Sequence, residues 1–244
     1  MRNENNEQNG FADVHDIFTR VSDKYDFMNR LMTFGKDSSW RRFLVSKAGL
    51  PMGGMILDAG IGTGGIAIEA LRKDPTLHIA GIDLTMEMMR AGMKRPGMER
   101  VGWCRADALR LPFSDGIFDA VVSGFLIRNV ANRLLAFSEQ VRVIRPGGRV
   151  VCLDTTPVPR NILTPFILFY LKVWIPCLGR LITGEKDAYH YLSGSTMSFM
   201  GPDKLAGLMK EAGLINVGFK RFMFGTIAVH WGEKPVLNDI RDSF

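Results

Sequence analysis

From Met55 onward, short apolar runs alternate with amphipathic segments, and this alternation narrows the fold more than any other feature of the chain. The runs predict strands at Met55–Ala59, His78–Asp83, Val101–Cys104, Phe118–Ser123 and Arg149–Asp154. Amphipathic spacing predicts helices near Gly65–Arg72, Met86–Lys94, Asn132–Ile144 and Pro202–Ala212. Strands joined through helices pair in parallel by right-handed crossovers, so we predict an α/β fold with helices on both faces of a mostly parallel sheet.

The two ends of the chain add to this sheet. Near the C-terminus, Val217–Met223 and Thr226–Trp231 flank Phe224-Gly225, which predicts an antiparallel hairpin at one edge. Near the N-terminus, apolar residues recur at helical spacing between Val14 and Leu50. We expect a single domain over residues 13–244, with a helical cover over 13–50, after a polar, disordered tail over 1–12 that lacks the apolar run of a secretory signal.

The charge of the chain favours an anionic partner. Lys and Arg outnumber Asp and Glu by 31 to 25, a net charge of +6 that suits either nucleic acid or a lipid surface. The segment from Arg128 to Arg180 holds eight basic and two acidic residues, so the excess is local. The three cysteines and four histidines lack the spacing of a zinc site or a disulfide framework, which predicts no metal and a cytoplasmic location.

One apolar segment raises the question of a membrane. Between Asn161 and Ile182, 15 of 22 residues are apolar, close to the length of a membrane span. Lys172 lies in the middle, and Pro165 and Pro176 are expected to break the helix, which argues against a span. A buried core helix, an apolar lid and a membrane-facing surface remain as interpretations.

The glycine-rich stretch Ile56–Gly65 (ILDAGIGTGG) follows the first predicted strand and opens the first predicted helix. Gly60, Gly62 and Gly64 allow the backbone to turn sharply and to bring its N–H groups against a ligand. Spaced as Gly60-x-Gly62-x-x-Gly65, the stretch also fits the dinucleotide-binding fingerprint, which by itself is a weak signal.

Three aspartates at strand ends make the ligand more specific. Asp58 can accept from an ammonium group or from N–H groups of the turn, Asp83 from both ribose hydroxyls, and Asp107 from an adenine amino group. Each aspartate alone could equally be a helix cap or a turn former. Together with the glycines they favour S-adenosylmethionine, whose amino-acid tail has no pyrophosphate.

Longer stretches of the chain resemble the ubiquinone/menaquinone biosynthesis C-methyltransferases, a family of class I S-adenosylmethionine-dependent methyltransferases. The similarity extends from Ile17 to Pro235. Its most specific elements are Lys24-Tyr25-Asp26-Phe27-Met28-Asn29, Arg128-Asn129-Val130, and Thr183-Gly184 with Tyr189 and Tyr191-Leu192. More widely shared elements are Ile56–Gly64, Leu111-Pro112-Phe113 and Arg145-Pro146-Gly147-Gly148. The chain departs from the family where Gly65 replaces a common Asp and Leu126 replaces a Gly.

The resemblance implies a Rossmann-like, seven-stranded fold and a set of site residues. In addition to the glycines and aspartates named above, the resemblance implies cofactor contacts at Thr63, Leu84, Ala108 and Gly124. It further implies methylation of a ring carbon on a polyprenylated quinol. The residues expected to position and polarise the quinol hydroxyl are Tyr25, Arg128, Asn129 and Tyr189, with Arg128 as an oxyanion stabiliser rather than a base.

The cysteine pattern and the overlap of the local basic excess with the apolar segment predict where the protein works. We expect a cytoplasmic enzyme in peripheral contact with the anionic inner face of the membrane, acting alone or as a homodimer, with an apolar lid over residues 157–200 on the substrate side. The acceptor is either a naphthoquinol or a benzoquinol, of open tail length.

Three other functions are compatible with parts of the sequence. A nucleic-acid methyltransferase is disfavoured because Ser123-Gly124-Phe125-Leu126 stands where amino-nitrogen enzymes carry an Asp/Asn-Pro-Pro-aromatic element, and no basic RNA-binding module is present. A small-molecule or sterol-type methyltransferase stays open because of Gly65 and Leu126. A non-enzymatic, cofactor-binding scaffold is disfavoured by the intact site residues.

Overall fold

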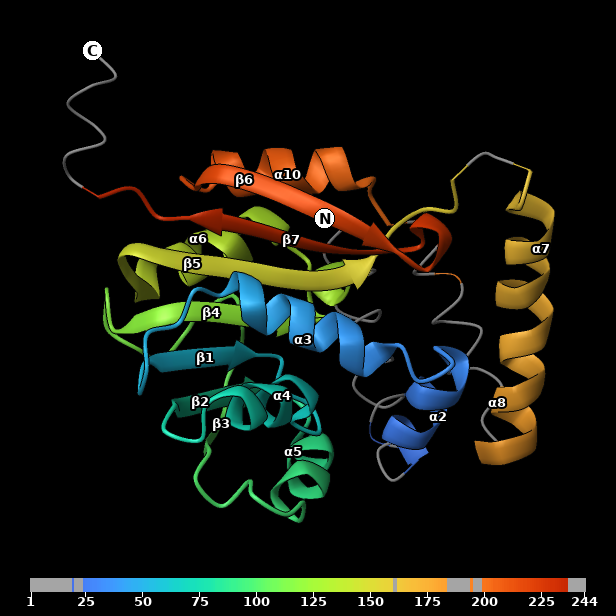
Figure 1. The fold of residues 1–244 in the computed structure, drawn as a ribbon, viewed down its shortest axis with the longest axis horizontal. Helices are drawn as coiled ribbons and strands as arrows, with labels where there is room; N and C mark the ends of the chain where they lie inside the picture. Colours follow the sequence, from blue (N-terminus) through green and yellow to red (C-terminus); the bar gives the residue numbers. More distant parts are fainter. Residues whose placement is uncertain (1–18, 20–23, 160–161, 184–193, 195–198, 237–244) are drawn as a thin grey trace, which may run out of the picture.

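The computed structural model describes residues 19, 24–159, 162–183, 194 and 199–236, and Figure 1 shows its central seven-stranded sheet. The strand order is β3-β2-β1-β4-β5-β7-β6, and β7 alone runs antiparallel to its neighbours. In chain order the strands are β1 (Met55–Ala59), β2 (His78–Asp83), β3 (Gly102–Arg105), β4 (Phe118–Gly124), β5 (Ile144–Thr155), β6 (Ile215–Phe222) and β7 (Ile227–Glu233). The predicted fold class, including the C-terminal hairpin, is confirmed.

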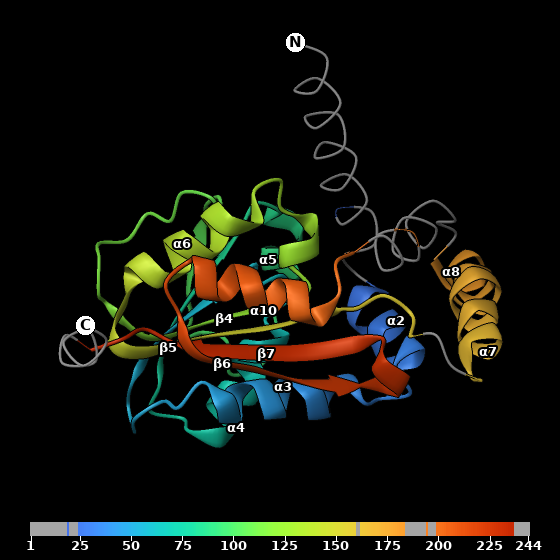
Figure 2. The same cartoon turned by 90° about the horizontal axis from the view of Figure 1, so that it is seen from above.

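Helices cover both faces of this sheet (Figure 2). They are α3 (Asp37–Lys47), α4 (Gly65–Lys73), α5 (Met86–Met93), α6 (Arg133–Val143) and α10 (Pro202–Glu211), with short turns η2 (Ile127–Asn129) and η4 (Met223–Gly225). Side chains alternate along β1, so Ile56 packs in one core with Leu44 of α3, whereas Leu57 packs in the other with Phe137 of α6 and Met209 of α10. A sheet buried on both faces explains the continuous apolar runs of the sequence.

The fifth strand begins earlier than the sequence predicts. Ile144, expected at a helix end, already pairs with Phe118, and the register then shifts before Ala120 meets Arg149. The shift accommodates the Arg145–Gly148 turn, where Gly147 has φ 77° and donates its N–H to the carbonyl of Lys234. The predicted start of the strand at Arg149 is therefore wrong: β5 begins at Ile144, before the bulge.

Two elements lie beyond the carboxyl ends of the strands (Figure 1). One is α2 (Tyr25–Met32), and the other is a single long helix made of α7 (Thr164–Phe169), the π-helical turn η3 (Tyr170–Trp174) and α8 (Ile175–Thr183). They pack on each other through Met28 and Met32 of α2 and Leu171 and Ile175 of the long helix.

The expected breaks at Pro165 and Pro176 do not occur. Pro165 lies in the first turn of α7, where its missing N–H has no helical partner to lose. Pro176 is the second residue of α8, and the wider π turn η3 that precedes this helix leaves room for the proline ring. The core-helix interpretation is wrong as well, because Phe166, Phe169 and Leu181 are exposed.

Candidate active site

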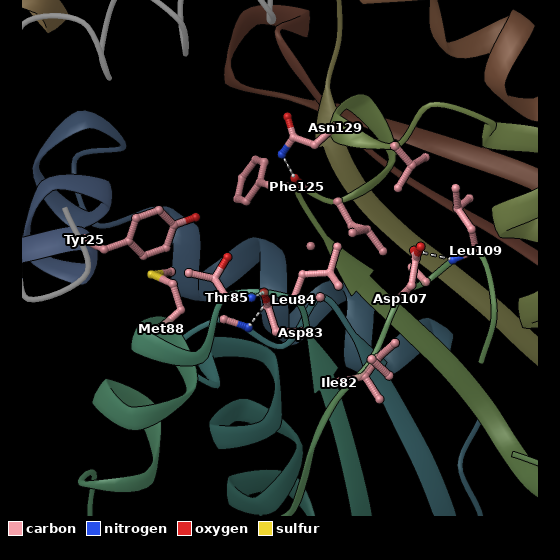
Figure 3. A pocket seen from close by; sticks show the side chains of 17 residues that line it. Tyr25, Ile82, Asp83, Leu84, Thr85, Met88, Asp107, Leu109, Phe125 and Asn129 are labelled. Carbon is pink, nitrogen blue, oxygen red and sulfur yellow. Dashed lines mark hydrogen bonds between the residues drawn. The ribbon is translucent and has the colours of Figure 1, made fainter. Parts of the chain in front are cut away.

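A pocket of about 360 Å³ opens where the carboxyl ends of β1, β2 and β4 meet (Figure 3). The chain runs outward from β1 to β3 on one side and from β4 to β5 on the other, so the pocket lies at the switch point where open α/β sheets bind ligands. Its walls are formed by Tyr25, Gly60, Gly62, Ile82, Asp83, Leu84, Thr85, Met88, Ala106, Asp107, Ala108, Leu109, Gly124, Phe125, Leu126, Asn129 and Val130.

The glycine-rich turn forms the floor of this pocket at β1. Gly60 and Gly62 have φ values of 72° and 53°, a left-handed backbone that glycine adopts without strain. The N–H groups of Gly60 and Ile61 both donate to the carbonyl of Ile82 at 2.8 Å, which ties the turn to β2. Gly64 lies outside the lining and serves packing instead, since a Cβ there would be 2.3 Å from Cε of Met98.

Asp83 at the end of β2 is held by the turn that it faces. Its Oδ2 accepts from the N–H of Gly62 at 2.9 Å and its Oδ1 from the N–H of Thr85 at 2.8 Å. Burial raises the pKa of this carboxyl, and the backbone donors oppose the shift. Each carboxylate oxygen has a second lone pair, so Asp83 can also accept from hydroxyl groups of a ligand in the pocket.

Asp58 lies behind the turn and does not line the pocket. The residue is 1% exposed, and neither carboxylate oxygen makes a hydrogen bond of normal geometry within the described residues. Burial raises its pKa to about 7, the charge of Asp83 adds to the shift, and the amide of Ala67 and Arg41 act against it. The amide of Ala67 is a weak partner for a buried carboxylate, and a cationic ligand group would be a stronger one.

Asp107 stands at the far end of the pocket from Tyr25 (Figure 3). Its Oδ1 accepts from the N–H of Leu109 at 2.9 Å, which closes a short turn and fixes the carboxylate at the pocket wall. Ala108 and Leu109 continue that wall. The adenine contact proposed for Asp107 stays a prediction, and its position agrees with it.

Thr63 has a role that the sequence did not reveal. It lies outside the pocket lining, and its hydroxyl donates to Oδ1 of Asp26 at 2.8 Å. Arg95 donates to the other oxygen of Asp26 at 2.6 Å and to the carbonyl of Thr63 at 3.1 Å. These three residues, called here the α2 clasp, hold α2 against the glycine-rich turn. Asp26 lies within the family-specific stretch Lys24–Asn29, and this stretch was the one sequence feature that could have pointed to the α2 clasp.

The four predicted catalytic residues are not all together. Tyr25 and Asn129 line the pocket, and the side-chain amide of Asn129 donates to the carbonyl of Phe125 at 3.0 Å. Arg128 does not line it, and Tyr189 lies outside the described residues. The guanidinium of Arg128 donates to Asp154 at 2.9 Å, and the backbone N–H of Arg128 donates to the same carboxylate at 3.1 Å. Asp154 was not predicted from the sequence.

The fold and the site together define a class I S-adenosylmethionine-dependent methyltransferase. Among solved structures, phosphoethanolamine N-methyltransferase 2 of Haemonchus contortus in complex with S-adenosyl-L-methionine superposes with a TM-score of 0.67 at 17% identity, covering 91% of this chain and 60% of that one. A SAM-dependent methyltransferase of Thermotoga maritima superposes with a TM-score of 0.64 at 20% identity, over 91% and 99% of the two chains. At this identity the likeness concerns the fold.

Sequence comparison then gives the family. The profile of the ubiE/COQ5 methyltransferase family matches residues 2–234, so the chain belongs to that family and is a C-methyltransferase. A ubiquinone/menaquinone biosynthesis C-methyltransferase of Desulfotalea psychrophila is 46% identical over 221 residues, covering 91% of this chain and 90% of that one. A demethylmenaquinone methyltransferase of Roseiflexus castenholzii is 38% identical over 221 residues, covering 91% and 93%.

The residues present fit S-adenosylmethionine. The pocket-facing carboxylate of Asp83 suits two hydroxyls, and the buried carboxyl of Asp58 behind the glycine-rich turn favours a cationic group on the pocket side of the turn. Gly62 is favoured in this cradle by its φ of 53°, and a Cβ there would also lie 3.3 Å from Cε of Met88. The cofactor supplies an electrophilic methyl group on a sulfonium.

Proposed function

We propose that the chain transfers this methyl group to a ring carbon of a polyprenylated quinol, a precursor of menaquinone or ubiquinone. The observation that carries the proposal is 38–46% identity, over 91% of this chain, to relatives named for such substrates. The apolar side chains of Met88, Leu126 and Val130 in the pocket suit a hydrophobic acceptor.

In this proposal the chain provides alignment rather than a strong base. Asp83 would hold the ribose hydroxyls, and Asp58, buried behind the glycine-rich turn, would attract the ammonium group of the amino-acid part. Tyr25 would meet the acceptor hydroxyl. The apolar wall excludes water from the reacting carbon. Arg128 would stabilise a developing oxyanion only through a water, since Asp154 holds its guanidinium and Arg128 does not line the pocket.

The reaction is tested with purified protein, labelled S-adenosylmethionine, and short-tailed demethylmenaquinol and demethylubiquinol analogues. Label in one of the quinols is the expected result, and it also identifies the ring. Label only in phenols without a prenyl tail would overturn the proposal in favour of a small-molecule methyltransferase. An Asp83→Ala variant, which we expect not to bind the cofactor, serves as the negative control.

The proposal includes a cytoplasmic enzyme that docks on the inner face of the membrane through the outer face of the Thr164–Thr183 helix. By length and apolarity Thr164–Ile182 could also cross a membrane, and 28% of it is buried. Phe166, Phe169 and Leu181 are 73%, 60% and 83% exposed. Lys172 and Arg180 are exposed beside them, and the sequence has no Asp or Glu from residue 155 to 184.

Liposome flotation tests the docking surface. We expect the protein to float with vesicles containing phosphatidylglycerol more than with phosphatidylcholine alone, and Phe166→Ser/Phe169→Ser to abolish flotation. Met52→Ser is the matched control, because Met52 is 90% exposed and precedes β1, at the end of that strand away from the long helix. Equal flotation of all variants, or no flotation of the wild type, would refute this docking surface. If the protein instead elutes as a stable dimer that buries this helix face, the face binds a second copy of the chain and not a membrane.

A further inference from the structure

Phe125, the first residue after β4, has a backbone conformation that is unusual for a large side chain. Its φ is 59°, in the left-handed region that residues with a Cβ avoid. Its N–H donates to the carbonyl of Leu153 at 2.7 Å, and its carbonyl accepts from the side-chain amide of Asn129 at 3.0 Å. Backbone strain of this kind persists only where the surroundings impose it, and it concentrates at functional sites.

The ring of Phe125 is also fixed from one side. The guanidinium carbon of Arg128 lies 5.0 Å from the ring centroid, within the range of a cation–π contact. Arg128 cannot move away freely, because its side chain is 3% exposed and paired with Asp154 at 2.9 Å. Arg128 and Asn129, neighbours in the sequence, thus hold the ring and the backbone of the same residue.

Phe125 forms part of the pocket wall at the end opposite Asp107. Tyr25 extends toward Phe125 in Figure 3, and Asn129 stands beside it. Of the residues that suit the cofactor's adenosine part, Asp83 lies across the pocket from Phe125, and Asp107 lies at the end away from Tyr25. The ring of Phe125 has no hydrogen-bonding group to offer the cofactor, so its face is available to a planar, apolar group that enters the pocket beside Tyr25.

We propose that Phe125 binds the acceptor: its ring is a fixed platform on which the planar quinol ring packs, and Asn129 and Arg128 are the positioning residues that hold this platform. The inference rests on the proposed function and goes beyond it by naming the residue that sets the plane of the acceptor. Aromatic rings prefer offset or edge-on packing, and methyl transfer requires the acceptor carbon to lie in line with the sulfonium. A platform held at three points fixes that orientation before the substrate arrives.

The experiment compares Phe125→Leu, which removes the ring at similar volume and the same left-handed backbone, with Phe125→Tyr, which keeps the ring. For Phe125→Leu we expect the KM for the quinol to rise about 3- to 10-fold, which corresponds to the loss of one aromatic pair. The Kd for S-adenosylhomocysteine, measured by calorimetry, should stay within about 2-fold. Phe125→Tyr should behave as the wild type. Phe43→Leu is the matched control, since Phe43 packs on Phe222 and Trp231, away from the pocket lining.

The positioning roles are tested by a double-mutant cycle. If Asn129 acts on acceptor binding through Phe125, Asn129→Ala should raise the quinol KM in the wild-type background and add no further rise to Phe125→Leu. Additive effects on KM would overturn the positioning role.

Two other results would overturn the platform itself. One is an unchanged quinol KM in Phe125→Leu, and the other is a loss of cofactor affinity as large as the loss for quinol, which would mean that the ring faces the sulfonium. A wild-type enzyme that methylates no quinol refutes the proposed function instead, so the two failures are distinguishable.

Discussion

Arg128 and Asp154 form a buried ion pair whose two members are 3% and 1% exposed in their side chains. Removing two charges from water is unfavourable, and their attraction offsets this only while both are present. Nε of Arg128 is buried as well and has no hydrogen-bond partner within the described residues, so the guanidinium depends on this one carboxylate and on the ring of Phe125. Stability and the role predicted for Arg128 in the reaction therefore depend on the same side chain.

Substitution of Arg128 should therefore destabilise the fold as well as slow the reaction. Arg128→Met leaves Asp154 buried without a counter-charge, and we expect the free energy of unfolding in urea to fall by about 3–5 kcal/mol. Arg128→Met/Asp154→Leu should recover much of this loss. Arg90→Met is the control: its pair with Glu87 is 3.9 Å long and 67% exposed on the Arg90 side, so the change should stay below about 1 kcal/mol.

The oxyanion role predicted for Arg128 can be judged only on folded protein. Because Arg128 lies outside the pocket lining, we expect turnover in that fraction to fall by less than the factor of about 10²–10³ that a lost oxyanion donor causes, while cofactor affinity changes by a few-fold. Equal losses of turnover and of cofactor affinity would contradict the role, and a destabilisation no larger than that of Arg90→Met would contradict the buried pair.

At the scale of elements, α2 connects the pocket to the outer helix. On one side the α2 clasp joins Asp26 to the glycine-rich turn, and on the other Met28 and Met32 pack against Leu171 and Ile175. The hydroxyl of Tyr170 also donates to the carbonyl of Met32. Tyr25 belongs to both regions, since it lines the pocket and packs on the apolar cluster between α2 and the long helix.

Loosening the α2 clasp should open α2 locally without unfolding the sheet. Asp26→Asn removes the ion pair with Arg95; because these side chains are 40% and 33% exposed, we expect a loss in global stability of only about 0.5–1 kcal/mol. Amide hydrogen exchange should nevertheless accelerate in α2 and remain unchanged in β1 and β4. Asp203→Asn, which breaks an exposed pair with Arg221, is the control. Unchanged exchange in α2 would show that its apolar side alone holds it.

These elements also show which parts of the structure the sequence could predict. Strands such as β1 and β2 match the prediction to the residue, since their apolar runs are local and their ends are marked by aspartates. The α2 clasp joins residues 37 and 69 positions apart, and no local pattern encodes such a contact. The site residues divide in the same way. Gly60, Asp83 and Asp107 belong to turns that a local sequence pattern marks. The contacts of Asp154 and Phe125 depend on packing between distant segments, which no local pattern shows.

At the scale of the whole molecule, the sheet buries ionisable groups whose protonation couples to folding. Asp58 lies between both helical layers, and burial raises its pKa from an ordinary 3.8 to about 7. The unfolded chain loses this proton near pH 4 and the folded chain only near pH 7, so the folded state loses stability as the pH rises between these values. Burial lowers the pKa of His230, which acts in the opposite direction below its ordinary value of 6.5.

A comparison of the wild type with Asp58→Asn isolates the contribution of Asp58, because His230 is common to both proteins. At about 1.4 kcal/mol for each pKa unit, the free energy of unfolding of the variant relative to the wild type should rise by up to about 4 kcal/mol between pH 4 and pH 8. Urea unfolding at several pH values measures the difference. Saturating S-adenosylhomocysteine should shrink it, because an ammonium group at Asp58 favours the charged carboxylate, which the variant lacks. A difference that stays constant with pH would show that Asp58 titrates normally, and a difference that the ligand leaves untouched would place the ammonium elsewhere.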